Sequence, residues 1–461
     1  MSVVGFGTVC IDYMVYLDEL PAEDSKVKAK KARILGGGNI GNTLTAIQRL
    51  GVPCVLISKV GSDSVARDIL AGFNKEGIDT SLVMSGVDMS SSFTYVMVTP
   101  GSRTCIHTGI KEDVTPNEIL CTVTMLKETV VNAGGVAMMH LDSRHTFAAT
   151  VMARWANEER ILTTLDCEKD REHFQDLLPL ADILFTNQNY PGLHKDLVGD
   201  TTSESNVYCV DALGSASSSA VARNSPPPPP PPPPPSAPPT APLSSSSGLD
   251  DAKGEEDEEY RGDSVAVSGK DALESTSLET DAELNKCVSG MEILLKQGRA
   301  RMVVTTLGDR GSILMTRLLA SGSEGTFKEA VDVEYWTELL SGLNIPDKKE
   351  HEYMIPFLET LPMKTHVPVW AESLRERGVD VVVCDAFPIS ARNIIDTTGA
   401  GDAFIGGFIT GICSHFSPTL CLKLATFTAA EKLKGHGGRQ SLPSGSSMMM
   451  SRSASRSRTP R

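Results

Sequence analysis

The sequence lacks the features that mark membrane, secreted and metal-cluster proteins. No apolar run reaches about 18 residues, the length that a helix needs to span a bilayer. The opening residues, MSVVGFG, have neither the basic start nor the cleavage pattern of a secretory signal peptide. The 10 cysteines stand singly, without a C-x-x-C pair or metal-like spacing, which argues against a disulfide framework. We therefore expect a cytoplasmic protein with no membrane segment.

The sequence also lacks an excess of positive charge. Its net charge is -15 at pH 7, which argues against nonspecific binding to nucleic acid. Its 461 residues are 40% hydrophobic, so the chain can bury at least one large core.

One long segment has the composition of a disordered insertion. Residues 191–286 are rich in Ser, Pro and acidic residues, and they include ten consecutive prolines from Pro226 to Pro235. Such a segment has too few large apolar residues to offset the entropy lost on ordering. The proline run would favour polyproline II, as a stiff spacer or as a ligand for an SH3- or WW-type domain. We favour the spacer.

Two further segments differ from the rest. Residues 318–378 interrupt the rhythm of strands but contain aromatic residues, so we predict an insertion of unknown order that packs somewhere. Residues 446–461 form a basic tail rich in Ser and Arg, which we expect to be solvated. Residues 1–190, 287–317 and 379–445 would then be three parts of one domain.

In those three parts, short apolar runs alternate with helical patterns. The runs VVGFG, CVLISKVG, GVAMMHLD, ILTTLD, ADILFTN, RMVVTTLG and DVVVCD are typical of strands buried on both faces. Helix candidates lie between several of them, at Thr43 to Leu50, Ser64 to Gly77 and Ala148 to Glu159. This alternation predicts an α/β fold with a mostly parallel sheet, in which ligands bind at the carboxyl ends of the strands.

A glycine-rich stretch, GGGNIGN, raises two interpretations. Gly36, Gly38 and Gly41 match the G-x-G-x-x-G pattern of dinucleotide-binding loops, and Asp63 could act as the ribose-binding acid of an oxidoreductase. However, about 28 residues separate this stretch from the first strand, whereas a dinucleotide loop follows the strand directly. The amides of Asn39 and Asn42 can both donate to and accept from hydroxyl groups, which suits a polyol better than a pyrophosphate.

A second loop, DTTGAGDAF, indicates anion binding. Gly399, Ala400 and Gly401 stand before a helical pattern, where free backbone N–H groups and the helix dipole favour a negative ligand. Asp402 follows at once, and a carboxylate beside an anion hole is a candidate general base. No G-K-[ST] follows the glycines, so this is not a Walker loop.

Both loops, in this order, resemble the two signatures of the PfkB, or ribokinase-like, family of carbohydrate kinases. The segments SKVGSDSVARDIL, GSRTCIHTG, LADILFTN and VVTTLGDRGSIL agree with the resemblance. It implies a three-layer α/β/α sandwich with a small β lid, a site for ATP with Mg²⁺, and a sugar or nucleoside site. A monovalent cation and a homodimer are compatible with it.

By position, the resemblance implies roles for particular residues. The substrate group would contain Asp12, Gly37, Gly38 and Asn42, with Arg103 in the lid hairpin. Gly399, Ala400 and Gly401 would form the anion hole, and Asp402 would be the catalytic base. The nucleotide would lie beside Asn187, Thr306 and Gly308, with FTAAEKLKGHGG flanking the adenine.

One position departs from the family pattern. The family usually has N-x-x-E after this strand, whereas this chain has NQNY, so Tyr190 replaces a Glu that helps to organise Mg²⁺. The metal ligands therefore stay unassigned. The segments HLDSRHTF and LDCEKDREHF resemble the ketohexokinase-like side of the family more than adenosine kinase. They suggest further residues near the site, namely Asp142, Arg144, Asp166 and Glu168.

Three functions stay open from the sequence. We favour an ATP-dependent kinase that phosphorylates a small sugar, a ketohexose or pentose, with a nucleoside as the alternative acceptor. The second is a catalytically weak family member that serves as a sugar sensor or scaffold, suggested by Tyr190 and the proline-rich insertion. The third is the dinucleotide-dependent oxidoreductase.

Overall fold

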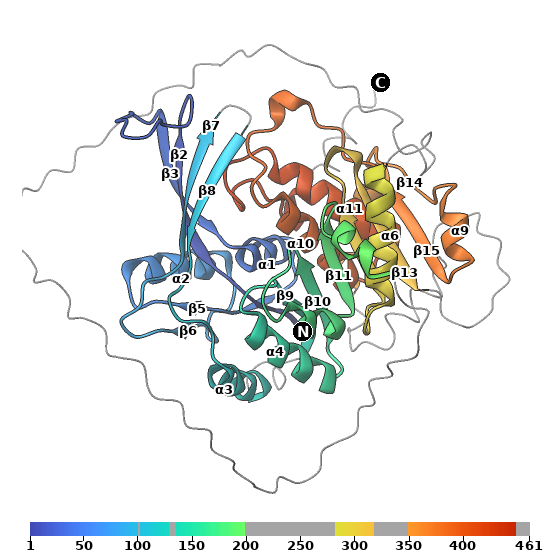
Figure 1. Cartoon of the computed structure of the whole chain (residues 1–461), viewed down its shortest axis with the longest axis horizontal. Helices are drawn as coiled ribbons and strands as arrows, with labels where there is room; N and C mark the ends of the chain where they lie inside the picture. Colours follow the sequence, from blue (N-terminus) through green and yellow to red (C-terminus); the bar gives the residue numbers. More distant parts are fainter. Residues whose placement is uncertain (100–101, 129–134, 199–281, 318–348, 449–461) are drawn as a thin grey trace, which may run out of the picture. The chain divides into compact units, whose positions relative to one another are not determined.

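A nine-stranded sheet forms the centre of the structure, a computed structural model that describes residues 1–99, 102–128, 135–198, 282–317 and 349–448 (Figure 1). Six neighbouring strands from β4 to β12 run parallel, and β13 and β14 are antiparallel to their neighbours. The order across the sheet is β14 (Thr365–His366), β15 (Val379–Cys384), β13 (Ser312–Arg317), β12 (Met302–Thr306), β11 (Ile183–Asn187), β10 (Leu162–Cys167), β9 (Val136–Leu141), β1 (Ser2–Phe6) and β4 (Cys54–Ile57).

Helices cover both faces of this sheet, because its strands are apolar on both sides. In β1, Val3 packs into one core cluster and Val4 into the other. One helical layer contains α1 (Asn39–Arg49), α2 (Ser64–Glu76), α8 (Ile355–Thr360), α10 (Ala400–Cys413) and α11 (Pro418–Lys432). The other contains α3 (Pro116–Leu126), α4 (Thr146–Glu158), α5 (Phe174–Leu177), α6 (Ala282–Lys296) and α9 (Ala371–Arg375). The predicted three-layer α/β/α sandwich is confirmed.

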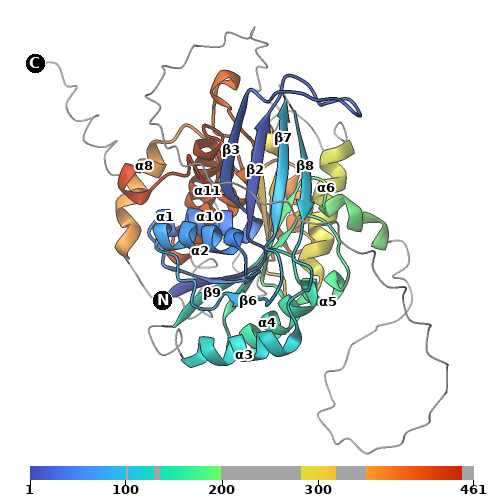
Figure 2. The ribbon, with the colours of Figure 1, turned by 90° about the vertical axis from the view of Figure 1, so that its left-hand side faces the viewer.

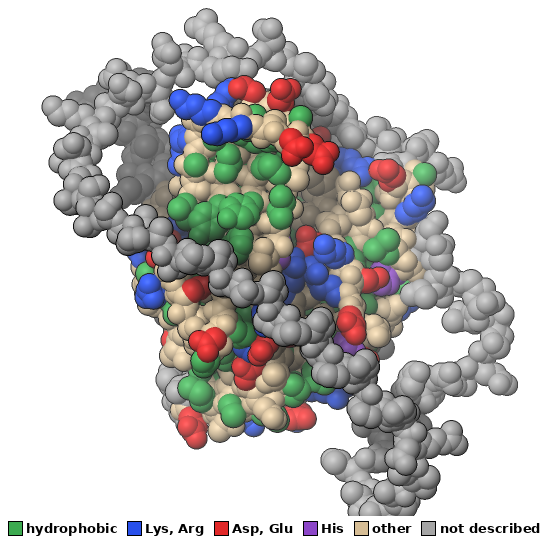
Figure 3. Space-filling view, turned by 60° about the vertical axis from the view of Figure 1, so that its left-hand side comes forward, with side chains coloured by type: hydrophobic (Ala, Val, Ile, Leu, Met, Phe, Trp, Pro, Cys, Tyr) green, Lys and Arg blue, Asp and Glu red, His purple; other side chains and the backbone are tan. Residues whose placement is uncertain are grey.

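A second sheet of four strands forms the predicted lid (Figure 2). Its order is β3 (Lys31–Gly37), β2 (Cys10–Tyr16), β7 (Phe93–Thr99) and β8 (Ser102–Thr108). Successive side chains alternate between its faces. Ile34, Tyr13, Tyr95 and Ile106 are paired in one row across the four strands, on the face opposite Asp12. Figure 3 shows hydrophobic side chains gathered over the lid. A separate two-stranded sheet joins β5 (Lys59–Val60) to β6 (Met84–Ser85).

The predicted helices agree with α1, α2 and α4 apart from their ends. Helix α1 begins at Asn39 and not at Thr43, because Gly38, with φ of 89°, turns the chain directly from β3 into the helix. Helix α2 begins where predicted: Asp63 accepts a hydrogen bond from the backbone N–H of Ala66 at 2.9 Å, which caps the helix. That same carboxylate had been the candidate ribose acid.

The predicted edges of the two insertions cut into elements that the structure describes. A 3-10 helix, η3 (Pro191–Val198), precedes residue 199, and α6 begins at Ala282, where it buries Leu284 and Cys287. Part of the second stretch, from residue 349, contains η6 (Lys349–Met354), α8, β14 and α9, and Met354 and Leu358 join the core. Residues 199–281, 318–348 and 449–461, with the proline run and most of the tail, lie outside the described residues.

The described part of the chain contains no helix long and apolar enough to cross a membrane. The nine cysteines within it are free thiols. Three more short 3-10 helices complete the elements: η2 (Leu178–Leu180), η5 (Gly308–Arg310) and η7 (Ala391–Asn393).

Candidate active site

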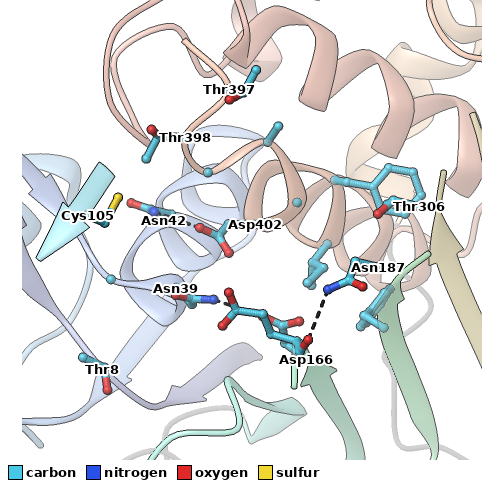
Figure 4. Close-up of a pocket in the computed structure, with 18 of the residues that line it drawn as sticks. Thr8, Asn39, Asn42, Cys105, Asp166, Asn187, Thr306, Thr397, Thr398 and Asp402 are labelled. Carbon is cyan, nitrogen blue, oxygen red and sulfur yellow. Dashed lines mark hydrogen bonds between the residues drawn. The ribbon is translucent and has the colours of Figure 1, made fainter. Parts of the chain in front are cut away.

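A cavity of about 510 Å³ lies between the lid and the carboxyl ends of β10, β11 and β12. Asp166, Thr186 and Thr306 stand at or near these strand ends, as expected for a parallel sheet. The lid contributes polar side chains from β2, β7 and β8, and the loop before α10 forms another wall. Figure 4 shows these side chains converging from the two sheets and from α1 and α10.

Most of the residues predicted from the two signatures meet at this cavity. Its walls include Asp12, Gly38, Asn42, Arg103, Asn187, Thr306, Gly399, Ala400, Gly401 and Asp402. Gly37 does not line the cavity but lies directly behind Asp12. Gly308 lies in an adjoining pocket, and Asp142 is buried behind the wall.

Asp402 is a buried carboxylate in the first turn of α10. Gly399 takes the left-handed conformation, with φ of 74°, and turns the chain into this helix. The side-chain amide of Asn42 donates to Asp402 Oδ2 at 2.8 Å (Figure 4). Burial raises the pKa of Asp402 to about 7, and the charges of Glu168 and Asp142 act in the same direction, whereas the hydrogen bond from Asn42 opposes the rise. Asp402 can therefore change its protonation near neutral pH.

The backbone at the start of α10 faces open space. A Cβ atom on Gly401 would meet no heavy atom within 4 Å, whereas one on Gly399 would lie 2.7 Å from Gly438 Cα. Helix N-termini carry unpaired N–H groups and a partial positive charge. The turn from Gly399 to Gly401 can therefore receive an anion directly above Asp402.

The glycine-rich stretch before α1 makes room for protein side chains and not for a pyrophosphate. A Cβ on Gly37 would lie 2.4 Å from Asp12 Oδ2, and one on Gly36 or Gly41 would lie 2.6 or 2.3 Å from the guanidinium of Arg439. A Cβ at any of the three positions would displace Asp12 or Arg439 from the space that it fills. This packing removes the dinucleotide interpretation of the motif.

Asp12 comes from β2 and is 6% exposed. The thiol of Cys10 lies 3.4 Å from Asp12 Oδ1, and burial raises the pKa of this carboxyl. Asp12 and Asn42 therefore present a carboxylate and an amide to the same cavity.

Three carboxylates line the cavity near the carboxyl ends of the strands: Asp166, Glu168 and Asp402. The side-chain amide of Asn39 donates to Asp166 Oδ2 at 3.3 Å. Burial, followed by the charges of Asp402 and Glu168, raises the pKa of Asp166 well above its usual value. Asp142, by contrast, is 1% exposed and accepts from three backbone N–H groups, those of Thr8, Ile40 and Arg144. The prediction that Asp142 lies near the site holds, but its contacts are with the backbone.

Arg103 links the lid to the anion-binding turn. Its Nη1 donates to Thr397 Oγ1 at 2.8 Å and to Thr398 Oγ1 at 3.0 Å, and it lies 3.8 Å from Asp396 Oδ1. The side chain therefore lines the cavity, although it is 38% exposed to solvent.

A second pocket adjoins the cavity and has a volume of about 530 Å³. Asn187 and Thr306 line both, so the two spaces adjoin at the ends of β11 and β12. Gly308 and Arg310 belong to the second pocket alone.

Tyr190 lies away from both pockets. It is 1% exposed, packs edge-to-face on Phe174, and donates from its hydroxyl to Asp170 Oδ1 at 3.0 Å. At the position where the N-x-x-E pattern has a glutamate, this chain therefore has a tyrosine that is buried in the core and lines neither pocket.

Arg439 is the residue that the sequence interpretation missed. Its Nε donates to Asn42 Oδ1 at 3.0 Å, and its Nη2 donates to the carbonyl oxygen of Gly37 at 2.5 Å. The sequence offered a signal, because Arg439 directly follows the FTAAEKLKGHGG segment. A single Arg in a polar turn does not by itself predict such contacts.

The comparisons with known proteins agree with this geometry. The family model described as "pfkB family carbohydrate kinase" matches residues 1–189 and 373–445, which contain both signatures. Thr306 and Gly308 lie outside the matched residues.

Individual relatives are distant. The chain is 24% identical to mouse ketohexokinase over 193 residues, which are 40% of this chain and 62% of that protein. It is 30% identical to a nucleoside kinase of Methanothermobacter thermautotrophicus over 96 residues, 21% of this chain and 31% of the other. The matches thus span less than two thirds of each relative. The solved Arabidopsis thaliana ribokinase, complexed with ribose and ATP, has the same fold, with a TM-score of 0.55, 15% identity, and coverage of 97% of both chains.

Proposed function

Because the chain belongs to the pfkB family of carbohydrate kinases, we propose that it transfers the γ-phosphate of ATP to a hydroxyl of a small sugar, a ketohexose or a pentose. One observation carries the proposal. Asp402 is a buried carboxylate that lies beside an open helix N-terminus and under a lid of polar side chains.

Asp402 has the properties of a general base. Burial raises its pKa to about 7, so it is able to accept a proton from a substrate hydroxyl near neutral pH. Asn42 holds its Oδ2 in place, and the turn from Gly399 to Gly401 offers N–H groups to the phosphoryl group that the hydroxyl attacks. In-line positioning and charge neutralisation are the main demands of phosphoryl transfer.

The substrate side is formed by Asp12, Gly38 and Asn42, with Arg103 closing the lid. The Asp12 carboxylate would accept hydrogen bonds from sugar hydroxyls, and the Asn42 amide would donate to one. Arg103 holds the lid against Thr397 and Thr398, which keeps water from the phosphoryl group once a substrate is bound. The nucleotide would extend from the anion hole toward the second pocket, past Asn187, Thr306 and Gly308.

A divalent cation would accompany the nucleotide. Asp166 and Glu168 line the cavity with Asp402, and Glu168 is paired with Arg144 and Arg171, each at 3.5 Å. No group of three or more His, Cys, Asp or Glu in the described part of the chain is arranged as a ready metal site. Mg²⁺ would therefore be held mainly by the nucleotide phosphates, with Asp166 and Glu168 in support. When bound, Mg²⁺ supplies positive charge to the phosphates.

A buried ammonium lies beside the loop before Gly399, where a monovalent cation would be a further source of positive charge. The ammonium of Lys432 is fully buried there, and its Nζ donates to the carbonyl oxygen of Asp396 at 2.6 Å. Burial lowers the pKa of Lys432 to about 8, so it is largely charged at neutral pH. This ammonium already supplies a positive charge to the loop before Gly399.

The test is a coupled assay of ADP release with ketohexoses, pentoses and nucleosides as acceptors. Sugar-stimulated release of ADP supports the proposal. Release with nucleosides alone would make the chain a nucleoside kinase instead. Sugar binding in calorimetry without any turnover would favour a sensor or scaffold, an alternative that the absence of the N-x-x-E carboxylate motivates.

Three further expectations stay predictions. A homodimer would have an apolar surface available on the lid, where Ile34, Tyr95 and Ile106 are 67%, 49% and 53% exposed. Light scattering measures the mass that decides this. Binding of the proline run to SH3- or WW-type domains and a cytoplasmic location need pull-down and imaging experiments.

A further inference from the structure

Arg439 is held tightly behind the wall of the cavity. Its guanidinium carbon lies 4.4 Å from the centre of the Phe73 ring. Its own backbone carbonyl accepts from Arg49 Nη1 at 2.7 Å, and Arg49 is in turn paired with Glu76 at 2.6 Å. The guanidinium is thus held by the Phe73 ring and by two acceptors, Asn42 Oδ1 and the Gly37 carbonyl oxygen, while Arg49 holds the backbone of Arg439.

Two glycines make this position accessible. A Cβ on Gly36 would lie 2.6 Å from Arg439 Nη1, and one on Gly41 would lie 2.3 Å from Nη2. The side chain therefore inserts between the end of β3 and the first turn of α1. This places it against Asn42 and against the backbone of Gly37.

The contact decides which way the Asn42 amide points. Arg has only donors, so the group of Asn42 that faces it must be the carbonyl oxygen. The NH₂ group then points to Asp402 Oδ2, at 2.8 Å. The reversed amide would direct N–H at a guanidinium and oxygen at a carboxylate, and both contacts would be unfavourable.

We propose that Arg439 is a positioning residue that fixes Asn42 as a hydrogen-bond donor to Asp402 and to the substrate. With Oδ1 bound to Arg439 and one N–H bound to Asp402, the second N–H of Asn42 is its remaining donor for a sugar oxygen. Asp12 would take hydroxyl protons. The inference rests on the proposed sugar kinase function for its consequence in catalysis, but the Arg439–Asn42 contact itself does not depend on turnover.

A double-mutant cycle tests the proposal. If Arg439 acts through Asn42, Arg439→Met lowers kcat/KM for the sugar by about 2- to 100-fold, the range of coupling between residues in contact. The same substitution in an Asn42→Leu background then has little further effect. Affinity for ATP without sugar stays near the parent value in all variants. Arg439→Lys, which keeps a charged donor, recovers part of the loss.

The control is Arg377→Met, which removes an exposed guanidinium that is paired with Glu292 at 2.9 Å on the far helical layer. It should leave kcat/KM unchanged in both backgrounds. Effects of Arg439→Met and Asn42→Leu that simply multiply would overturn the proposal, because the two residues would then act independently.

Urea unfolding of the wild type, Arg439→Met, Asn42→Leu and the double variant separates this inference from the proposed function. Coupling between the two substitutions in the free energy of unfolding reports the contact, whether or not any sugar is phosphorylated. A wild type without turnover on any acceptor refutes the kinase proposal alone. Absence of coupling in unfolding refutes the role of Arg439, even in an active enzyme.

Discussion

Replacing Asp402 with asparagine should have opposite effects on turnover and on the stability of the folded protein. Asn keeps an acceptor oxygen for the Asn42 amide but has no charge and takes no proton. Turnover should fall by roughly 10²- to 10⁴-fold, the usual contribution of general acid–base catalysis. The free energy of unfolding should rise, because the charged form of the buried Asp402 destabilises the folded protein and asparagine has no charge.

The magnitude follows from the pKa. Burial raises the pKa of Asp402 from 3.8 to about 7, a rise of roughly three units, which corresponds to about 4 kcal/mol. Below pH 3.8 the carboxyl is protonated in both states and carries no penalty. As the pH rises toward 7, the unfolded chain ionises while the folded one resists, so stability is lost, and the full cost applies above about pH 7. Asp402→Asn should remove this cost.

The assay is urea unfolding of both proteins at several pH values. The variant should gain up to about 4 kcal/mol over the wild type at pH 8, less at pH 5.5, and only about 0.6 kcal/mol at pH 4. Asp68→Asn, at an exposed position on α2, controls for the loss of one negative charge. A gain that is equal at all pH values, or a loss at pH 8, would refute the argument that burial raises the pKa of Asp402. Retention of more than about a tenth of the wild-type rate would exclude Asp402 as the base.

The remaining predictions concern binding, packing and the insertion. Asn42→Leu should weaken sugar binding by on the order of 1 to 3 kcal/mol in calorimetry and leave ATP affinity in the absence of sugar unchanged; equal losses would mean that Asn42 only supports the helix. Gly41→Ala should destabilise the protein by about 1 to 3 kcal/mol in urea, since the new Cβ would lie 2.3 Å from Arg439 and 2.8 Å from Phe73. Gly72→Ala, in a helix with open space beside it, should be neutral or stabilising, and a similar loss there would refute the steric explanation. Replacing residues 201–281, which lie outside the described part, with a short Gly/Ser linker should leave the melting temperature and turnover near the parent values, whereas a collapse of either would show that the segment contributes to the fold.

The central sheet was predictable because its strands are buried on both faces. The runs in β9 and β15 are apolar except for His140 and Asp380, and they correspond to strands whose residues are all buried. Strands β2, β3, β7 and β8 were harder to predict, since one face of the lid meets a polar cavity and the other is exposed. Strands β3 and β8 mix polar and apolar residues, with Lys31 and Arg33 on β3, and so have no continuous apolar signal.

The site was predictable where backbone conformation limits the residue type. The turn at Gly399 and the helix that follows it were evident from the small residues before Asp402. The glycines before α1 were evident too, but the reason for them was not, because it depends on Asp12 and Arg439. Arg439 lies almost four hundred residues further along the chain, and no local pattern shows which side chain fills a gap beside a glycine. Tyr190 shows the same limit, since a local pattern assigned it to the metal region and the fold buries it against Phe174.

Residues 199–281 interrupt the domain between η3 and α6. These two flanking elements contact each other, because a Cβ on Gly290 of α6 would lie 1.8 Å from the carbonyl oxygen of Pro191 in η3. The two elements pack on each other so closely that only glycine fits at the contact. The two elements that bound this interruption, η3 and α6, are therefore packed on each other within the described residues. Strands β11 and β12, which lie on either side of the interruption, pair in parallel, so Asn187 and Thr306 are matched in register at their carboxyl ends and both line the cavity.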